Sequence, residues 1–69
     1  MLLGDQMDII YTARIVGRGM SWPATEYMLR RALEDAALVG ATVTVNERGE
    51  KRIRYPWTLC GLIVDYEPI

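Results

Sequence analysis

Polar and apolar side chains alternate along residues 7–16, and this period of two is typical of a β-strand. One side of the predicted strand is apolar and consists of Met7, Ile9, Tyr11, Ala13 and Ile15. The other side is mixed and consists of Asp8, Ile10, Thr12, Arg14 and Val16. The pattern therefore predicts a strand with one face suited to a core.

A helical period follows the first strand. The apolar positions recur at three- and four-residue steps and are Met28, Leu29, Ala32, Leu33, Ala36 and Val39, while the opposite side carries Glu26, Arg30, Arg31, Glu34 and Asp35. Ser21 has the side chain of an N-cap, and Pro23 suits the first helical turn. Gly40 suits the left-handed residue that ends many helices. We expect one amphipathic helix that begins after Ser21 and ends before Gly40.

The second half of the chain predicts three further strands. ATVTVN (41–46) and KRIRY (51–55) alternate about the turn NERGE (46–50), in which Gly49 is available for a positive φ. Pro56 either ends that pairing or confines it to an edge of the sheet. In the last strand, Thr58, Cys60, Leu62, Val64 and Tyr66 share one face, and Leu59, Gly61, Ile63 and Asp65 share the other.

The predicted order is β-α-β-β-β, which is an α+β two-layer sandwich with one helix on one face of a mainly antiparallel sheet. Such a helix leaves the other face of the sheet uncovered. Its polar positions would be Thr12, Arg14, Thr42, Thr44, Arg52 and Arg54. Its aliphatic positions would be Ile10, Val16, Leu59 and Ile63, and we predict that these form a dimer interface, because aliphatic side chains gathered on one sheet indicate a contact surface.

Length and cysteine content favour association as well. The 69 residues make a single domain, 1–69, in which residues 1–6 have no period and are expected to fray. Cys60 is the only cysteine and there is no histidine, so an internal disulfide and a Cys/His metal site are both excluded. A domain with so small a core is usually stabilised further by a disulfide, a metal or association with a second copy, and a homodimer is the option that remains. The lone thiol favours the cytoplasm, and no apolar run reaches the length of a membrane span.

The charge pattern leaves two interpretations open. The net charge is −1, which gives no general attraction to nucleic acid. Basic residues gather locally at Arg48, Lys51, Arg52 and Arg54, and Arg14 would join them across the sheet. With Tyr55 adjacent, this cluster is compatible with binding single-stranded RNA, although a solvated hairpin is the commoner meaning of such a surface.

Gly17-Arg18-Gly19 precedes the predicted helix, where backbone amides can bind a phosphate. The dinucleotide fingerprint needs a third glycine at the position of Trp22, so a plain strand-to-helix turn is the favoured interpretation. Trp22 and Trp57 each flank a proline and are candidates either for the core or for a partner surface.

Residues suited to catalysis are few. Cys60 lies in an apolar run with no histidine to activate it. Asp65 and Glu67 are spaced so that they share a face, but a chain of this length offers little depth for a pocket. We therefore expect no enzymatic activity and no cofactor.

These observations predict a non-catalytic protein-binding module that acts through a surface as a homodimer. The predicted partner-binding residues are Arg14, Trp22, Arg48, Lys51, Arg52, Arg54 and Trp57. In size and economy alone, the chain resembles the small inhibitors that phages encode against host or defence complexes, anti-CRISPR proteins among them. The alternative is a nucleic-acid-binding module that uses the arginine-rich hairpin and the open sheet face.

Overall fold

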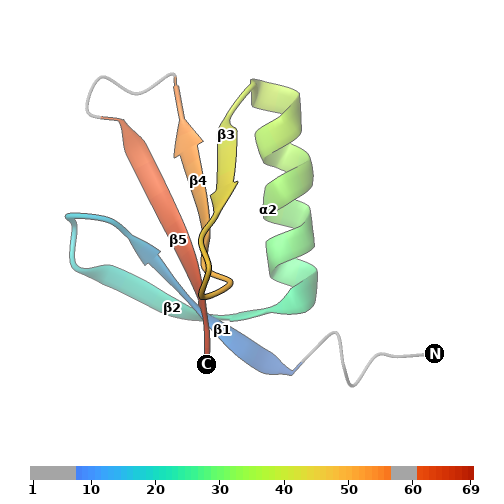
Figure 1. Ribbon diagram of the computed structural model, residues 1–69, viewed down its shortest axis with the longest axis vertical. Coiled ribbons are helices and arrows are strands. Elements are labelled where there is room, and N and C mark those ends of the chain that lie inside the picture. Colours follow the sequence, from blue (N-terminus) through green and yellow to red (C-terminus); the bar gives the residue numbers. More distant parts are fainter. Residues whose placement is uncertain (1–7, 57–60) are drawn as a thin grey trace.

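The computed structural model describes residues 8–56 and 61–69, and these form two layers (Figure 1). One layer is a five-stranded antiparallel sheet and the other is a helix that packs on one of its faces. The elements are β1 (Ile9–Ile15), β2 (Met20–Thr25), α2 (Glu26–Val39), β3 (Thr42–Val45), β4 (Lys51–Tyr55) and β5 (Leu62–Pro68). The predicted α+β two-layer sandwich is confirmed.

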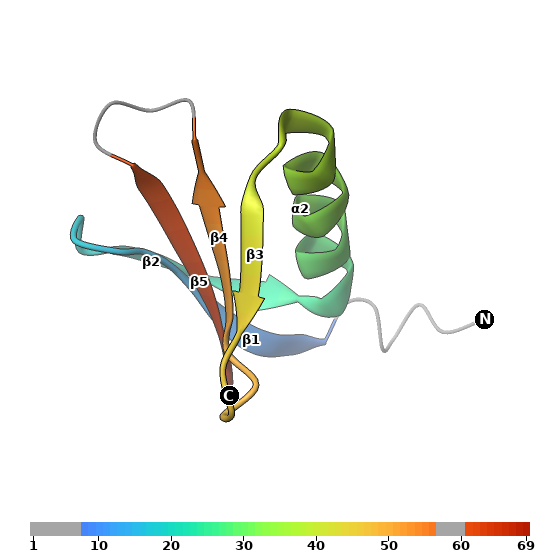
Figure 2. The ribbon, with the colours of Figure 1, turned by 45° about the horizontal axis from the view of Figure 1, so that its top comes forward.

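The strands lie in the order β2-β1-β5-β4-β3, so β2 and β3 are the two edges of the sheet. Every neighbouring pair is antiparallel, and it follows that the two edge strands run in the same direction. A connection between parallel strands has to cross the sheet, and α2 is this connection (Figure 2). The helix therefore covers one face and leaves the other open.

The predicted order of elements is wrong at residues 20–25, which form β2 and not the start of the helix. Pro23 lies opposite Thr12 in this edge strand, where its missing N–H is tolerated. The N-cap is Thr25 and not Ser21, because the Thr25 hydroxyl accepts a hydrogen bond of 3.1 Å from the Met28 amide. The observed order is β-β-α-β-β-β.

Gly17-Arg18-Gly19 is the turn of the hairpin between β1 and β2. The Arg18 amide donates to the Ile15 carbonyl at 3.2 Å, and the two glycines have φ values of 81° and 67°. The prediction of a strand-to-helix turn is wrong for the same reason as the predicted helix start. The helix N-terminus that a phosphate site would need lies at the other end of β2.

The buried core lies between α2 and the sheet. Among the described residues it consists of Ala13, Ala24, Leu29, Ala36, Ile53, Val64 and Tyr66. In residues 8–56 and 61–69, Leu29 and Ile53 are the two large side chains with less than 2% of their surface exposed. The predicted apolar side of the first strand is confirmed for Tyr11, Ala13 and Ile15, which belong to this core or pack against it, whereas Ile9 is 49% exposed and Met7 lies outside the described residues.

The helix contacts the sheet through a narrower stripe than its sequence predicts. Leu29 and Ala36 are buried, whereas Met28 and Val39 are 38% and 46% exposed. The last two residues lie at the margins of the stripe, where the helix surface curves away from the sheet. The Tyr11 hydroxyl donates to Glu26 Oε1 at 2.9 Å and so joins the first turn of α2 to β1.

Candidate interaction surface

The sheet face opposite α2 carries a continuous row of polar residues. Ala13, Ile53 and Val64 are buried on the α2 side of the sheet. Because side chains alternate along each strand, the residues next to them in β1, β4 and β5 point to the open face. The strand register aligns Thr44, Arg52, Asp65, Arg14 and Ser21 across all five strands, in that order from β3 to β2. We call these five residues the polar row.

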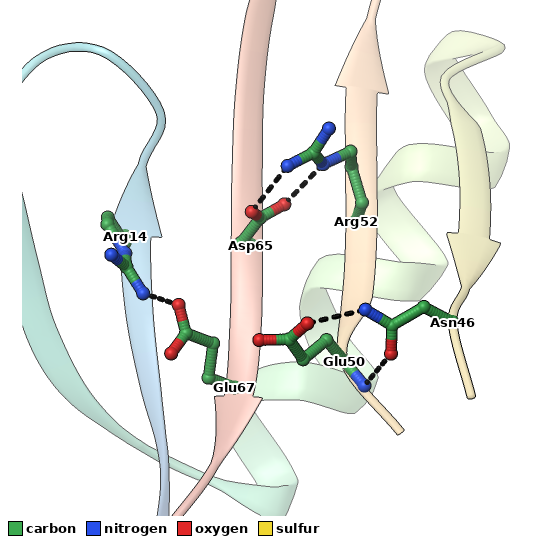
Figure 3. A network of polar contacts seen from close by, with 6 residues as sticks. All are labelled: Arg14, Asn46, Glu50, Arg52, Asp65 and Glu67. Carbon is green, nitrogen blue, oxygen red and sulfur yellow. Dashed lines mark hydrogen bonds and ion pairs between the residues drawn. The ribbon is translucent and has the colours of Figure 1, made fainter. Parts of the chain in front are cut away.

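Ion pairs hold the charged members of this face in place (Figure 3). Arg52 donates two hydrogen bonds to Asp65, from Nε to Oδ1 at 2.7 Å and from Nη2 to Oδ2 at 2.9 Å. Arg14 forms an ion pair with Glu67. Glu67 lies two residues after Asp65 in β5 and therefore on the same face of the sheet. The two ion pairs connect the central strand β5 to its neighbours β1 and β4. The bidentate contact between Arg52 and Asp65 fixes the plane of the guanidinium group.

The Arg52 hydrogen bonds hold the pKa of the Asp65 carboxyl below its ordinary value of 3.8. Partial burial opposes this shift, and the positive charges of Arg52 and Arg14 add to it. A carboxyl whose pKa is lower in the folded state stabilises the fold above its unfolded pKa, and this stability is lost as the pH falls through the folded pKa.

We therefore expect the free energy of unfolding to fall as the pH is lowered from about 5 towards 2, and the substitution Asp65→Asn to flatten this dependence. The Asp65→Asn variant is expected to be less stable than the wild type at pH 7 and to approach it in acid. Urea unfolding at a series of pH values measures both effects. A second variant, Arg52→Gln, removes the hydrogen-bond donor of Asp65 and should flatten the slope in the same way. Equal slopes for the Asp65→Asn variant and the wild type would contradict the assignment.

The turn between β3 and β4 is organised by the Asn46 side chain. Asn46 Oδ1 accepts hydrogen bonds from the Arg48 and Glu50 amides at 2.9 and 3.0 Å, and its Nδ2 donates to Glu50. Gly49 has the predicted positive φ, 84°. A hollow of about 240 Å³ lies beside this turn and is lined by Thr44, Asn46, Glu50, Arg52 and Asp65. It is smaller and more polar than the pockets that usually hold small organic ligands.

The predicted partner-binding residues do not form one surface. Arg14, Arg52 and Arg54 lie on the open face, and Arg48 lies in the β3–β4 turn. Lys51 points to the α2 side, because it alternates with Arg52 and aligns with Tyr66. Trp22 is half-buried against the core, and Trp57 lies outside the described residues.

The predicted dimer residues are also separated. The Val16 amide donates to the Ile63 carbonyl at 2.9 Å, so these two lie side by side. Ile10 is six residues from Val16 along the first strand, or roughly 20 Å at the usual rise. Thr12 and Arg14 lie between them in the chain, the pairing with β2 is irregular between Ile9 and Tyr11, and Leu59 lies outside the described residues. The aliphatic contact surface expected from the sequence is thus interrupted by polar side chains.

The sequence pattern did not predict two features of these surfaces. It did not pair Arg52 with Asp65 or Arg14 with Glu67, although all four residues alternate with apolar neighbours. It predicted a strand at residues 41–46 but not that β3 is an edge of the sheet. All four β3 residues are exposed, and Val43 and Val45 are 40% and 58% exposed. Alternation signals a strand, but it contains no signal for which strand is an edge.

Comparison of the chain with protein-family models, with curated proteins and with solved structures finds no match. In the part of the chain that the structure describes, no helix has the length and apolar character needed to cross a membrane. Residues 8–56 and 61–69 contain no group of three or more side chains placed to hold a metal ion.

Proposed function

We propose that this chain is a non-catalytic protein-binding module that presents its open sheet face to a partner protein and acts as a homodimer. The observation that supports the proposal is that α2 packs on one face of the sheet and leaves the opposite face, which carries the polar row, uncovered. More specifically, we propose that the chain is a small inhibitor of a host or defence complex, of the kind that phages encode.

The ion pairs support binding through this face, because they reduce the entropy lost when a partner docks. Arg52 and Asp65 already hold each other in place, so a partner does not have to order them. Arg54 lies two residues after Arg52 in β4, on the same face, and its neighbours on the adjacent strands are the uncharged Thr42 and Ile63. It is exposed and forms no ion pair with another described residue, which makes it the arginine best placed to bind a partner carboxylate.

A protein partner fits this face better than a nucleic acid does. Glu67 and Asp65 neutralise Arg14 and Arg52, which were two of the arginines on which the nucleic-acid alternative depended. Binding to phosphates relies on a surplus of positive charge, and the paired arginines contribute little to one. A surface with alternating charges suits a partner with complementary charges of both signs.

The substitution Arg54→Glu tests the proposal. Wild-type protein, the Arg54→Glu variant and a control variant, Arg31→Glu on the solvent side of α2, are immobilised and exposed to an extract of the native source. We expect Arg54→Glu to reduce capture of the specific partner at least tenfold, since a charge reversal at a docking surface costs several kcal/mol. Arg31→Glu should leave capture unchanged, and both variants should keep the wild-type melting temperature.

Equal capture by the wild type and the Arg54→Glu variant would overturn the use of this face. A labelled single-stranded oligonucleotide provides the second readout, and we expect no binding at physiological salt. Oligonucleotide binding that weakens steeply as the salt concentration rises would replace the proposal with the nucleic-acid alternative.

A further inference from the structure

The two edges of the sheet differ in how well they are protected from pairing with another strand. In β2, Pro23 removes one backbone donor from the edge, which is a common way to block pairing. In β3, the sequence Thr42-Val43-Thr44-Val45 has no proline and no charge, and all four residues are exposed. Its short length is the single protective feature it has, so β3 is the edge open to a further strand.

The hydrogen-bond pattern shows which groups of β3 are available. The Asn46 amide donates to the Glu50 carbonyl at 3.1 Å, so Asn46 and Glu50 form a hydrogen-bonded pair of the antiparallel ladder. Such pairs alternate, and the amide and carbonyl of Thr44 therefore point to Arg52 in β4. Those of Val43 and Val45 point away from β4, to the free edge.

We propose that β3 pairs in antiparallel fashion with β3 of a second copy, with Thr44 on the two-fold axis. This inference rests on the homodimer of the proposed function and names its interface. In this register Val43 lies opposite Val45 of the partner subunit, and the outward amides and carbonyls of both residues form four hydrogen bonds across the axis. Side chains on the same face meet, which an antiparallel pairing requires. The two sheets become one, with both helices on the same side.

The apolar side chains of β3 are complementary in this arrangement. Val43 and Val45, which are exposed in the single chain, cover each other on the α2 side. The same register brings the turn that carries Arg48 beside the partner's residues 39–42, at the C-terminal end of α2. The last turn of α2 has no basic residue, and the partial negative charge of a helix C-terminus attracts Arg48 in preference to Glu47, its neighbour in the turn. By symmetry, this contact forms twice.

The expected affinity is modest. A standard interface covers about 800 Å² on each partner, and a four-residue strand covers less than this. The exposed Val39 and the Arg48 turn, at the two ends of β3, have to supply the remainder. We therefore expect a dissociation constant on the order of micromolar.

Cross-linking at Thr44 tests the register directly. In a Cys60→Ser background, Thr44→Cys places two thiols opposite each other in a non-hydrogen-bonded pair, where the Cα atoms are about 4.5 Å apart and within the range of a disulfide. Oxidised glutathione should convert most of this variant to a covalent dimer. The control is Thr42→Cys in the same background, on the same face of the same strand. It faces Asn46 of the partner subunit and should remain largely uncross-linked.

Charge at the same position gives a second, independent test. Both Thr44→Lys and Thr44→Glu place like charges on the axis, so each variant alone should sediment as a monomer, with dimer affinity at least tenfold weaker than in the wild type. An equimolar mixture of the two should restore the dimer, because lysine then faces glutamate. Circular dichroism checks that both variants are folded.

The outcomes separate this proposal from the one on which it rests. A wild-type dimer that is insensitive to both charges and does not cross-link at Thr44 would overturn the β3 interface and leave the homodimer intact. A wild-type chain that sediments as a monomer at hundreds of micromolar would overturn both. Loss of capture by Arg54→Glu is measured separately and depends on neither result.

Discussion

Replacement of Ile53 by alanine is expected to lower the free energy of unfolding by about 2–5 kcal/mol. Ile53 has no exposed surface and lies at the centre of β4, between Val43 and Val64 in the strand register. Truncation removes buried apolar contacts and leaves a cavity that the neighbouring strands cannot close without losing their hydrogen bonds. Domains of this size are stable by only a few kcal/mol, so we expect the variant to be largely unfolded at 37 °C.

Urea unfolding followed by circular dichroism measures this effect. The matched control is Leu38→Ala, which removes a comparable amount of apolar surface from a side chain that is 84% exposed. That control should change the free energy of unfolding by less than about 0.5 kcal/mol. If the two variants were equally stable, Ile53 would not be the central core residue of the sheet.

The substitution Ala36→Leu is expected to be the second most damaging single change, at about 1–3 kcal/mol. Ala36 is fully buried on α2, and two of the sheet residues in the same core are also alanines, Ala13 and Ala24. These small side chains allow the helix to lie close to the sheet. A leucine at position 36 has no space to occupy and forces the helix away from Ile53 and its neighbours.

The neighbouring residue provides the control for this prediction. Ala37 is exposed on the same helix, so Ala37→Leu makes the same chemical change with the same small effect on helix propensity. We expect its melting temperature to match that of the wild type, and that of the Ala36→Leu variant to fall by several degrees, at about 4–8 °C per kcal/mol. A fall of the same size in both variants would show that helix propensity and not packing sets the result.

The two proposed surfaces are connected through Thr44. This residue ends the polar row on the open face and also lies on the proposed two-fold axis at the edge. Pairing of two β3 strands therefore joins two polar rows into one, with Arg54 of each copy on the same side of the extended sheet. A partner with two matching sites would bind such a dimer with higher avidity than it binds one chain.

Local patterns predicted four of the five strands, β1, β3, β4 and β5, and much of the helix, and they failed at β2, where the tertiary context outweighs them. The alternation at residues 7–16 and 51–55 placed Ala13 and Ile53 on the side that packs against the core, as observed. Proline at position 23 is compatible both with the first turn of a helix and with an edge strand. The pairing of residues 20–25 with β1 decided between these two environments, and it also moved the N-cap from Ser21 to Thr25.

The candidate site shows the same division. Sequence alternation placed Arg14, Arg52 and Arg54 together on the open face. It did not pair Arg52 with Asp65, because that contact depends on β4 and β5 being neighbours at one particular register. Trp22 is half-buried against the core because it lies in β2, a strand that the sequence pattern did not predict.

The sequence by itself determined the class of this protein, its single amphipathic helix and the face to which most strand residues point, because these depend on periods of two and 3.6 residues within short segments. Only the tertiary structure decided the strand order, and with it the ion pairs of the open face and the exposed edge at β3. Strand order depends on contacts between residues far apart in the chain, and the pattern within one strand contains no information about its neighbours.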